Sequence, residues 1–316
     1  MRIKITYQLI LALVVSCVCG QIPPQPLPEW KITVKVVDES SQPVGGADVE
    51  VSYYVKPPPE RTEAGESIHG PTDTNGVFRV SHQNTGSIGL GFKAAKTGYY
   101  SATKGHEFAK FKESNPAKWN PTMTLLLKKI GKPIPMYAKC VMQMPPEREK
   151  GVGYDLAVGD WVAPDGKGKN TDIVFTSHFD KRAENDWDYK LTVSFPNAGD
   201  GIQPFTVSDL EKTSALRSPH EAPENGYEPQ WVKTQSQRPG EYSRYGIDES
   251  LNFFFRVRTI LDEKGNVKSA NYGKIYGDFM NFCYFFNPTP NLRNVEFDTT
   301  RNLMKDLGPS EHVMQP

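Results

Sequence analysis

The first residues to test for catalysis or metal binding are the six histidines, His69, His82, His106, His178, His220 and His312. No two of them form a His-x-x-x-His pair and none has a cysteine close by, whereas catalytic zinc needs three protein ligands around an open position. The best cluster is His178 with Asp180, which strand alternation would place on one face, and Asp186 and Asp188 follow closely. We interpret this cluster as the solvated end of a strand. The sequence therefore predicts no metal site and no cofactor.

Three other motifs resemble reactive or ion-binding sites without meeting their requirements. Residues 65–70 miss the Gly-x-Ser-x-Gly elbow by one position and lie in a Pro-rich loop rather than between a strand and a helix. Residues 165–169 lack the spacing of a phosphate-binding loop. Residues 73–76 and 197–201 lack the EF-hand pattern, and tight turns explain their Asp, Asn and Gly. We assign no catalytic residue and favour a non-catalytic protein, with a secreted hydrolase as the alternative.

Aromatic side chains are the remaining candidates for ligand contact. Flat rings that stay half exposed can stack on the apolar face of a sugar or on another ring. We select Trp119, Trp187 and Trp231, which fall in loops or on polar strands, as candidate ligand-binding residues. The expected partner is a glycan or a protein. A third hypothesis is a structural or assembly component of the cell surface, for which no ligand is needed.

The N-terminus predicts export. Arg2 and Lys4 precede an apolar run at 5–15 and then small residues, which is the pattern of a secretory signal peptide over residues 1–20. Cleavage after Gly20 would leave a Pro-rich spacer at 21–29. Alternatively, residues 14–17 resemble a bacterial lipobox, and Cys17 would then carry a lipid anchor. We expect a secreted, periplasmic or lipid-anchored protein of a bacterial envelope.

The charge balance and the cysteines bear on partners and compartment. Without Arg2 and Lys4 the 37 basic residues fall to 35, against 37 acidic ones, and no dense basic run occurs. This balance argues against nucleic acid and against a membrane, except through a lipid anchor. Outside the signal region only Cys140 and Cys283 remain. They form either one disulfide or two separately buried thiols, and we slightly favour the thiols.

The segments that position the candidate residues are predicted to be strands. In residues 30–131, apolar residues alternate with polar ones at 32–36, 49–55 and 77–80, and further strands are expected at 88–94 and 123–127. Gly, Pro, Asn and Asp turns separate them, and residues 56–71 read as a polar loop. Several short strands with such turns predict a β-sandwich.

This first unit resembles the carboxypeptidase regulatory-like domain, a transthyretin-like β-sandwich. Five segments in order carry the resemblance: Val-Lys-Val-Val-Asp (34–38), Gln-Pro-Val-Gly-Gly-Ala-Asp-Val (42–49), Thr-Asp-Thr-Asn-Gly-Val-Phe (72–78), Lys-Thr-Gly-Tyr-Tyr (96–100) and Thr-Leu-Leu-Leu-Lys-Lys (124–129). The segment between 55 and 72 is longer and richer in Pro and Glu than this family leads us to expect. The resemblance implies an accessory module with no catalytic residues.

The rest of the chain predicts a second β-rich domain, a sandwich or a jelly-roll-like fold. Residues 132–150 read as a linker, 151–300 as the domain and 301–316 as a C-terminal tail. Strands are expected at 154–162, 172–179, 189–195 and 201–207. A late hairpin pairs 253–258 with residues 272–286, which form one long or two bent strands. Residues 210–246 read as irregular, with a short helix near 208–216. The whole chain is thus expected to be all-β.

The second domain also resembles a group of uncharacterised secreted bacterial proteins that carry such a sandwich in front. The matching segments are 154–156 with 159–164, 195–202, and Asn-Pro-Thr-Pro-Asn-Leu-Arg-Asn-Val-Glu-Phe-Asp (287–298). The resemblance implies a shared fold and brings no known activity. A non-catalytic binding or structural role therefore remains the leading hypothesis.

Overall fold

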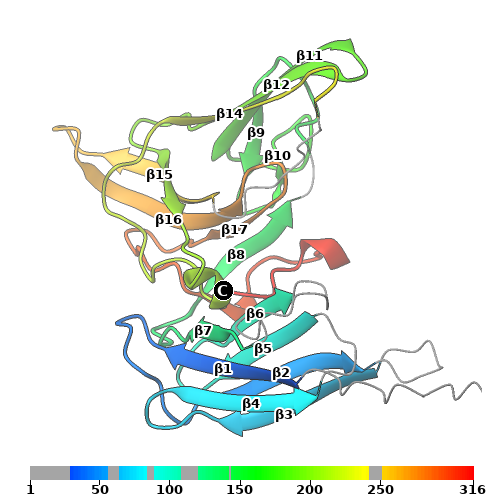
Figure 1. The fold of residues 1–316 in the computed structure, drawn as a ribbon. Helices are drawn as coiled ribbons and strands as arrows, with labels where there is room; N and C mark the ends of the chain where they lie inside the picture. Colours follow the sequence, from blue (N-terminus) through cyan, green and yellow to red (C-terminus); the bar gives the residue numbers. More distant parts are fainter. Residues whose placement is uncertain (1–28, 56–63, 84–88, 108–119, 142–143, 242–250) are drawn as a thin grey trace, which may run out of the picture.

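The protein folds into two β-sandwiches, and the prediction of an all-β chain is confirmed (Figure 1). The structure is a computed structural model that describes residues 29–55, 64–83, 89–107, 120–141, 144–241 and 251–316. The expected signal peptide and spacer, with the lipidation candidate Cys17, lie outside these residues, as does Trp119. Among the described residues, no helix is long and apolar enough to cross a membrane.

The first sandwich packs a three-stranded sheet, in the order β4-β1-β7, against a four-stranded sheet in the order β3-β2-β5-β6. The strands are β1 (Glu29–Val37), β2 (Asp48–Val55), β3 (Ala64–Pro71), β4 (Val77–Gln83), β5 (Gly89–Ala95), β6 (Ala102–Glu107) and β7 (Thr122–Leu126). The alternating residues Ile32, Val34 and Val36 of β1 are fully buried, as are Val49 and Val51 of β2. Their period of two places them on one face, so the two sheets enclose a single core.

The sequence analysis did not predict two strands of this sandwich. Strand β3 lies inside the predicted polar loop 56–71, where it pairs with β2 from Asp48↔Pro71 to Val55↔Ala64. Strand β6, which was not predicted, pairs with β5 at the opposite edge of the same sheet. Both are edge strands with few apolar side chains, so the hydrophobic pattern is weak and main-chain pairing to a neighbour defines them.

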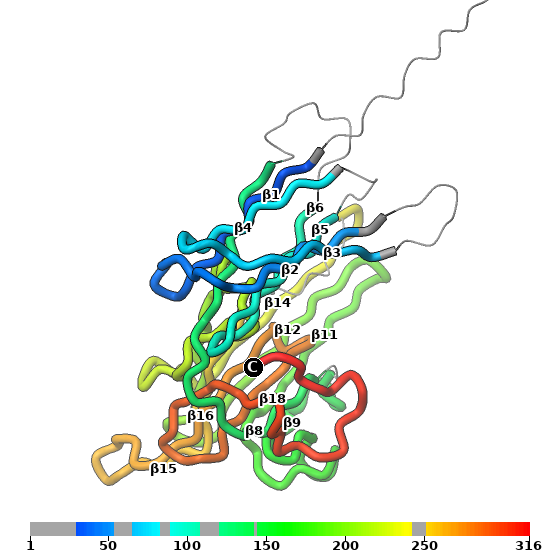
Figure 2. Tube along the Cα trace, turned by 90° about the horizontal axis from the view of Figure 1, so that it is seen from below, coloured from blue at the N-terminus to red at the C-terminus, as the bar shows by residue number. Residues whose placement is uncertain are grey.

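The second sandwich packs a five-stranded sheet, β10-β9-β11-β12-β14, against a six-stranded sheet, β13-β15-β16-β17-β8-β18. The strands are β8 (Ile134–Val141), β9 (Val152–Asp155), β10 (Asp160–Trp161), β11 (Ile173–Ala183), β12 (Asp186–Ser194), β13 (Gly201–Thr206), β14 (Gln230–Gln237), β15 (Leu251–Leu261), β16 (Val267–Gly277), β17 (Phe282–Phe286) and β18 (Phe297–Asn302). Figure 2 shows the strands β1–β6 grouped together and apart from β15, β16 and β18.

Two assignments differ from the sequence expectation. The predicted linker 132–150 contains β8, which pairs with β17 and β18 inside the six-stranded sheet. The segment expected to be irregular, 210–246, contains β14, whereas the short helix expected near 208–216 is present as a 3-10 helix at Glu211–Thr213. Of the two alternatives for 272–286, the structure has two strands, β16 and β17, because the chain turns at Gly277 and Phe279, which both have positive φ.

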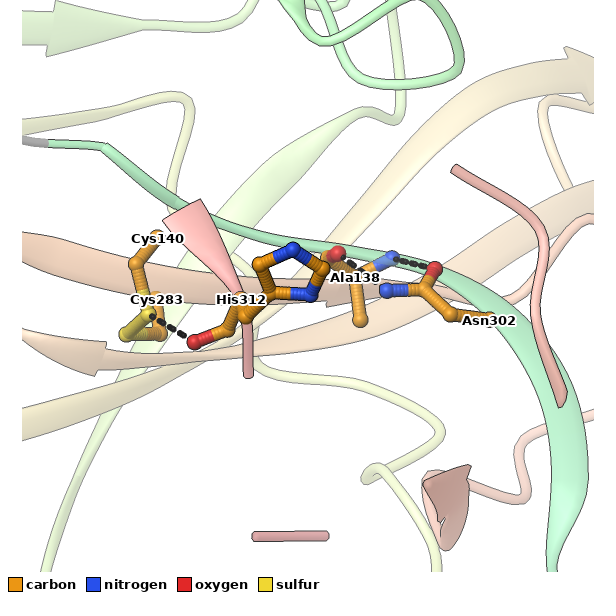
Figure 3. The surroundings of a disulfide bond; sticks show 5 residues. All are labelled: Ala138, Cys140, Cys283, Asn302 and His312. Carbon is orange, nitrogen blue, oxygen red and sulfur yellow. Dashed lines mark hydrogen bonds between the residues drawn. A yellow bond between two sulfur atoms is a disulfide. The ribbon is translucent and has the colours of Figure 1, made fainter. Parts of the chain in front are cut away.

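The C-terminal tail packs against the second sandwich. Met304 joins its core, and Lys139 of β8 forms an ion pair of 2.9 Å with Glu311 in a short 3-10 helix, Pro309–Glu311. The Asn302 side chain makes two hydrogen bonds to the backbone of β8: its oxygen accepts from the Ala138 N–H, and its N–H donates to the Ala138 carbonyl (Figure 3). The tail therefore holds the outer side of β8 in place.

Cys140 and Cys283 form a disulfide, so the favoured interpretation as separate thiols is wrong. The two residues face each other on the antiparallel strands β8 and β17, and the His312 carbonyl lies 3.8 Å from the Cys140 sulfur (Figure 3). The strand pairing brings together cysteines that are 143 residues apart in the chain. This proximity depends on β8 belonging to the sheet, which the linker interpretation excluded.

Candidate binding groove

The histidine and aspartate cluster of the sequence analysis is a set of surface ion pairs. His178 Nδ1 lies 2.6 Å from Glu149, while Asp180 lies 2.7 Å from Arg182. Arg182 also contacts Asp186 at 2.8 Å, and this contact holds the pKa of that carboxyl below its usual range. Within the described part of the chain, no three His, Cys, Asp or Glu side chains are grouped to hold a metal ion. The interpretation of the cluster as a solvated strand end agrees with these contacts.

A groove of about 400 Å³ lies at one end of the second sandwich and contains Trp187. We call it the Trp187 groove. Strands β11, β12 and β14 supply one wall, and residues 144–148 and the turn after β16 supply the rest. The lining residues are Met144, Pro145, Pro146, Arg148, Ser177, Phe179, Trp187, Tyr189, Gln235 and Met280.

Strand alternation explains why the aromatic residues gather there. Phe179 of β11 and Tyr189 of β12 are directly paired across the two strands. Trp187 lies two residues before Tyr189 and so shares its face of the sheet. The ring centroids of Phe179 lie 5.7 Å from Trp187 and 6.4 Å from Tyr189. On the far side of β12, Tyr189 is paired with Gln235 of β14, which extends the same face.

The segment before β9 is fixed across this face by contacts to β11. The Glu149 N–H donates a hydrogen bond of 2.8 Å to the Ser177 carbonyl, and the Glu149 carboxylate contacts His178. These contacts place Arg148 with its guanidinium carbon 5.1 Å from the centre of the Phe179 ring, a cation–π arrangement. No carboxylate among the described residues forms an ion pair with Arg148. The Arg148 guanidinium therefore lies beside the Phe179 ring in the lining of the groove.

Tyr189 lines the groove, but its hydroxyl is buried beneath the surface. The side chain is only 7% exposed, and its buried hydroxyl has no hydrogen-bond partner in the described part of the protein. Burial raises the pKa of Tyr189 to about 12, and the nearby Arg148 charge opposes this effect. The hydroxyl thus keeps its proton at neutral pH and can donate. An unmade hydrogen bond of a buried hydroxyl costs about 1–3 kcal/mol.

The structure describes two of the three tryptophans selected from the sequence. Trp187 lines the groove, and Trp119 lies outside the described residues. Trp231 does not line the groove; it is partly buried against the core of the second sandwich, with its ring 5.1 Å from Phe253 and 5.5 Å from Phe279. Its position on a polar-looking edge strand made it seem accessible, but its face of β14 points inward. Ligand binding by Trp187 stays a prediction.

Sequence reasoning missed Tyr189, Arg148 and Met280. Tyr189 was assigned to a strand but not to a site, because an alternating strand residue ordinarily belongs to the core. Arg148 was part of a segment interpreted as a polar breaker, and Met280 lay within 272–286, which was predicted to form one long or two bent strands. No local motif joins these positions, so the groove arises from the fold alone.

Comparisons with known proteins give distant structural similarities. No protein-family model matches the chain, and no curated protein matches it. The resemblances to the carboxypeptidase regulatory-like domain and to secreted bacterial proteins therefore stay predictions. Among solved structures, 3-chlorocatechol 1,2-dioxygenase from Rhodococcus opacus 1CP is 14% identical, with 34% of this chain and 62% of that one covered and a TM-score of 0.26.

Two further structures are similar to the same limited degree. Catechol 1,2-dioxygenase from Acinetobacter sp. ADP1 is 14% identical over 35% of this chain, with a TM-score of 0.25. The major pilin SpaD from Corynebacterium diphtheriae is 9% identical over 79% of this chain and 61% of that one, also with a TM-score of 0.25. This chain spans 62% and 55% of the lengths of the two dioxygenases. At these TM-scores the similarities identify no function.

Proposed function

We propose that this chain is an exported, non-catalytic protein that binds a partner through the Trp187 groove. The observation that carries the proposal is the Trp187 groove itself, a recess of about 400 Å³ made largely of apolar side chains, with the partly exposed Trp187 in its wall. Ligand sites are commonly concave and apolar, with a few polar groups that fix orientation.

Export is supported by the leader pattern and by the disulfide. Arg2 and Lys4 before the apolar run at 5–15 are typical of a signal peptide. Disulfides such as Cys140–Cys283 persist in the periplasm, at cell surfaces and in secreted proteins, and are rare in the cytosol. We place the mature protein at a bacterial envelope, either released or held by a lipid on Cys17. The first sandwich would then act as an accessory module that presents the second.

The partner is a glycan or a protein of the envelope, and one comparison tests whether the groove binds it. The mature chain is immobilised and probed with a glycan array and with envelope fractions, in parallel with a Trp187→Ala variant. We expect the variant to lose at least about tenfold in affinity for whatever the wild type retains, because a half-buried aromatic anchor contributes about 2 kcal/mol or more.

A matched control is Lys190→Gln, which changes an exposed residue on the outward face of the same strand. This control should bind like the wild type. Binding that is equal in the wild type and in Trp187→Ala would contradict the proposal, since the ligand would then lie elsewhere. If the chain instead binds no ligand but forms oligomers, and Trp187→Ala forms them equally well, the structural role is favoured.

A further inference from the structure

We infer that a pocket beside the β15–β16 hairpin binds an acidic sugar, with Arg256 of β15 holding the carboxylate of the sugar. The pocket has a volume of about 730 Å³ and shares no lining residue with the Trp187 groove. We call it the Arg256 pocket. The inference goes beyond the proposed function and does not depend on it, because the two sites are separate.

Arg256 is a buried cation without a carboxylate partner. It is 9% exposed, its Nε donates a hydrogen bond of 2.7 Å to the Gly199 carbonyl, and its Nη1 donates one of 3.2 Å to the Glu224 carbonyl. Its guanidinium carbon lies 4.8 Å from the centre of the Tyr227 ring. Carbonyls and a ring carry only partial negative charge, and no described carboxylate forms an ion pair with Arg256. A buried charge is costly unless an opposite charge pairs with it.

One nitrogen of Arg256 remains available to a ligand. Its Nη2 donates to no acceptor among the described residues, yet it is not closed off from solvent as the Tyr189 hydroxyl is. Because Arg256 lines the pocket, this nitrogen is the donor that a bound anion would meet. A guanidinium nitrogen and a carboxylate form a charge-assisted hydrogen bond, which is about twice as strong as a neutral one.

The other charged residues of the lining add to the positive field. Lys268 is exposed and forms no ion pair in the described part of the chain, whereas Arg293 pairs with Glu221 at 3.3 Å. The described lining has one carboxylate, that of the exposed Glu224. Three cationic side chains therefore face one acidic one, and such a local excess of positive charge attracts an anion.

The rest of the lining favours a sugar as the body of this anion. Only two of the lining side chains are aliphatic, Leu261 and Val267. The side-chain amide of Asn225 and the side-chain oxygen of Asn266 have no hydrogen-bond partner among the described residues. These groups can pair with sugar hydroxyls, which would cost free energy if they were buried unpaired. The pocket volume also falls in the range of small-molecule sites.

The test is isothermal titration calorimetry of the protein with glucuronate and with glucuronamide, two probes that differ only at the acid group. We expect glucuronate to bind at least about tenfold more tightly than glucuronamide, and more tightly than inorganic sulfate. A free sugar acid and the end of an acidic polysaccharide share this chemistry. An oligosaccharide of four glucuronate units distinguishes these sources, because only a polysaccharide site should bind it at least about tenfold more tightly than the single sugar.

Three variants assign the preference to the Arg256 pocket. Arg256→Gln should remove the preference for glucuronate, provided that its urea unfolding shows a folded protein. Lys268→Gln changes an exposed residue and should weaken glucuronate binding about threefold. Glu224→Gln removes the lining carboxylate and should strengthen binding by a similar factor. The last two variants decide the matter if Arg256→Gln fails to fold.

Two controls leave the pocket unchanged. Lys264→Gln removes a positive charge from the same hairpin at a residue outside the lining, and it should bind glucuronate like the wild type. Trp187→Ala should do the same, because it alters only the other site.

The results that overturn the inference differ from those that overturn the proposed function. Equal affinity for glucuronate and glucuronamide, or no binding of either, overturns the acidic sugar. Sulfate or a tetraglutamate peptide that binds more tightly than glucuronate overturns it as well. Glucuronate binding that Lys268→Gln and Glu224→Gln leave unchanged places the anion elsewhere. None of these results bears on partner binding through Trp187, which fails only if Trp187→Ala retains the partner.

Discussion

Tyr100 of the first sandwich donates a hydrogen bond of 3.2 Å to Glu296, which immediately precedes β18 in the second sandwich. Glu296 is almost completely buried and also accepts the N–H groups of Gly131 at 2.9 Å and Lys132 at 2.6 Å. Its carboxylate lies 2.7 Å from His220. One side chain therefore joins the two sandwiches and the chain that connects them.

Replacing Glu296 should loosen this junction and change its response to acid. Burial alone would raise the pKa of Glu296, but the N–H groups of Gly131 and Lys132 and the His220 ring outweigh it and lower the pKa from the ordinary 4.5. A lowered folded-state pKa means that the stabilisation is present above pH 4.5 and is lost as the pH falls through the folded value. Glu296→Gln should cost about 1–3 kcal/mol at pH 7 in urea unfolding.

The acid response provides the control for that prediction. In Glu296→Gln the stability should fall less between pH 5 and pH 3 than in the wild type, because the group that titrates is gone. Tyr100→Phe removes only one hydrogen bond and should cost about 1 kcal/mol while the acid response remains. An identical acid response in Glu296→Gln and wild type would contradict this account of the junction.

The disulfide should carry a large part of the stability of the second sandwich. It closes a loop with a sequence separation of 143 residues, and loss of a native disulfide costs about 2–5 kcal/mol. The double variant Cys140→Ser/Cys283→Ser should therefore unfold at a clearly lower urea concentration. Added reductant should destabilise the wild type and leave the double variant unchanged. If reductant leaves the urea unfolding of the wild type unchanged, the disulfide is contradicted.

Lys233 of β14 and Asp278, just after β16, form an ion pair between the two sheets of the second sandwich. Asp278 is 2% exposed and Lys233 12% exposed, so removing one partner leaves a poorly solvated charge. Asp278→Ala should cost about 3–5 kcal/mol, and the double variant Lys233→Met/Asp278→Leu should cost less than that. Arg301→Gln, which breaks an exposed pair with Asp298, is the matched control and should cost less than about 1 kcal/mol. If Asp278→Ala and Arg301→Gln lose the same stability, the assignment of Lys233–Asp278 as a buried ion pair is contradicted.

The two described tryptophans of the sequence prediction should behave differently. Trp231→Ala removes a ring packed on Phe253 and Phe279, and should cost about 3–5 kcal/mol in unfolding experiments. Trp187→Ala removes a ring at the groove and should lose less stability but more ligand binding. If Trp187→Ala proves the more destabilising of the two, the groove wall is part of the structural core.

The sequence predicted the elements whose side chains carry a strong pattern. Ile32, Val34 and Val36 alternate with polar residues, and this pattern predicted β1. The Phe-rich segment at 253–258 predicted β15. Strand β3 and strand β14 have polar side chains on an edge, so their pairing depends on main-chain hydrogen bonds that no composition pattern reveals. Pro133 and Pro135 led to the interpretation of the segment that contains β8 as a linker.

The site was harder to predict than the fold. Trp187 was selected for its residue type, but its neighbours come from four separate segments, with Arg148 before β9 and Met280 after β16. Sequence spacing cannot bring such positions together. That the Tyr189 hydroxyl has no hydrogen-bond partner among the described residues is visible only once burial and hydrogen bonds are known. Cys140 and Cys283 illustrate the same point, because only the β8–β17 register sets them side by side.

The most direct test of the central claim is the affinity of Trp187→Ala for the partner that the wild-type chain retains from a glycan array or from envelope fractions, measured beside the Lys190→Gln control. If the partner binds in the Trp187 groove, Trp187→Ala should lose at least about tenfold in affinity while Lys190→Gln binds like the wild type. Equal affinity in the wild type and in Trp187→Ala would contradict the account.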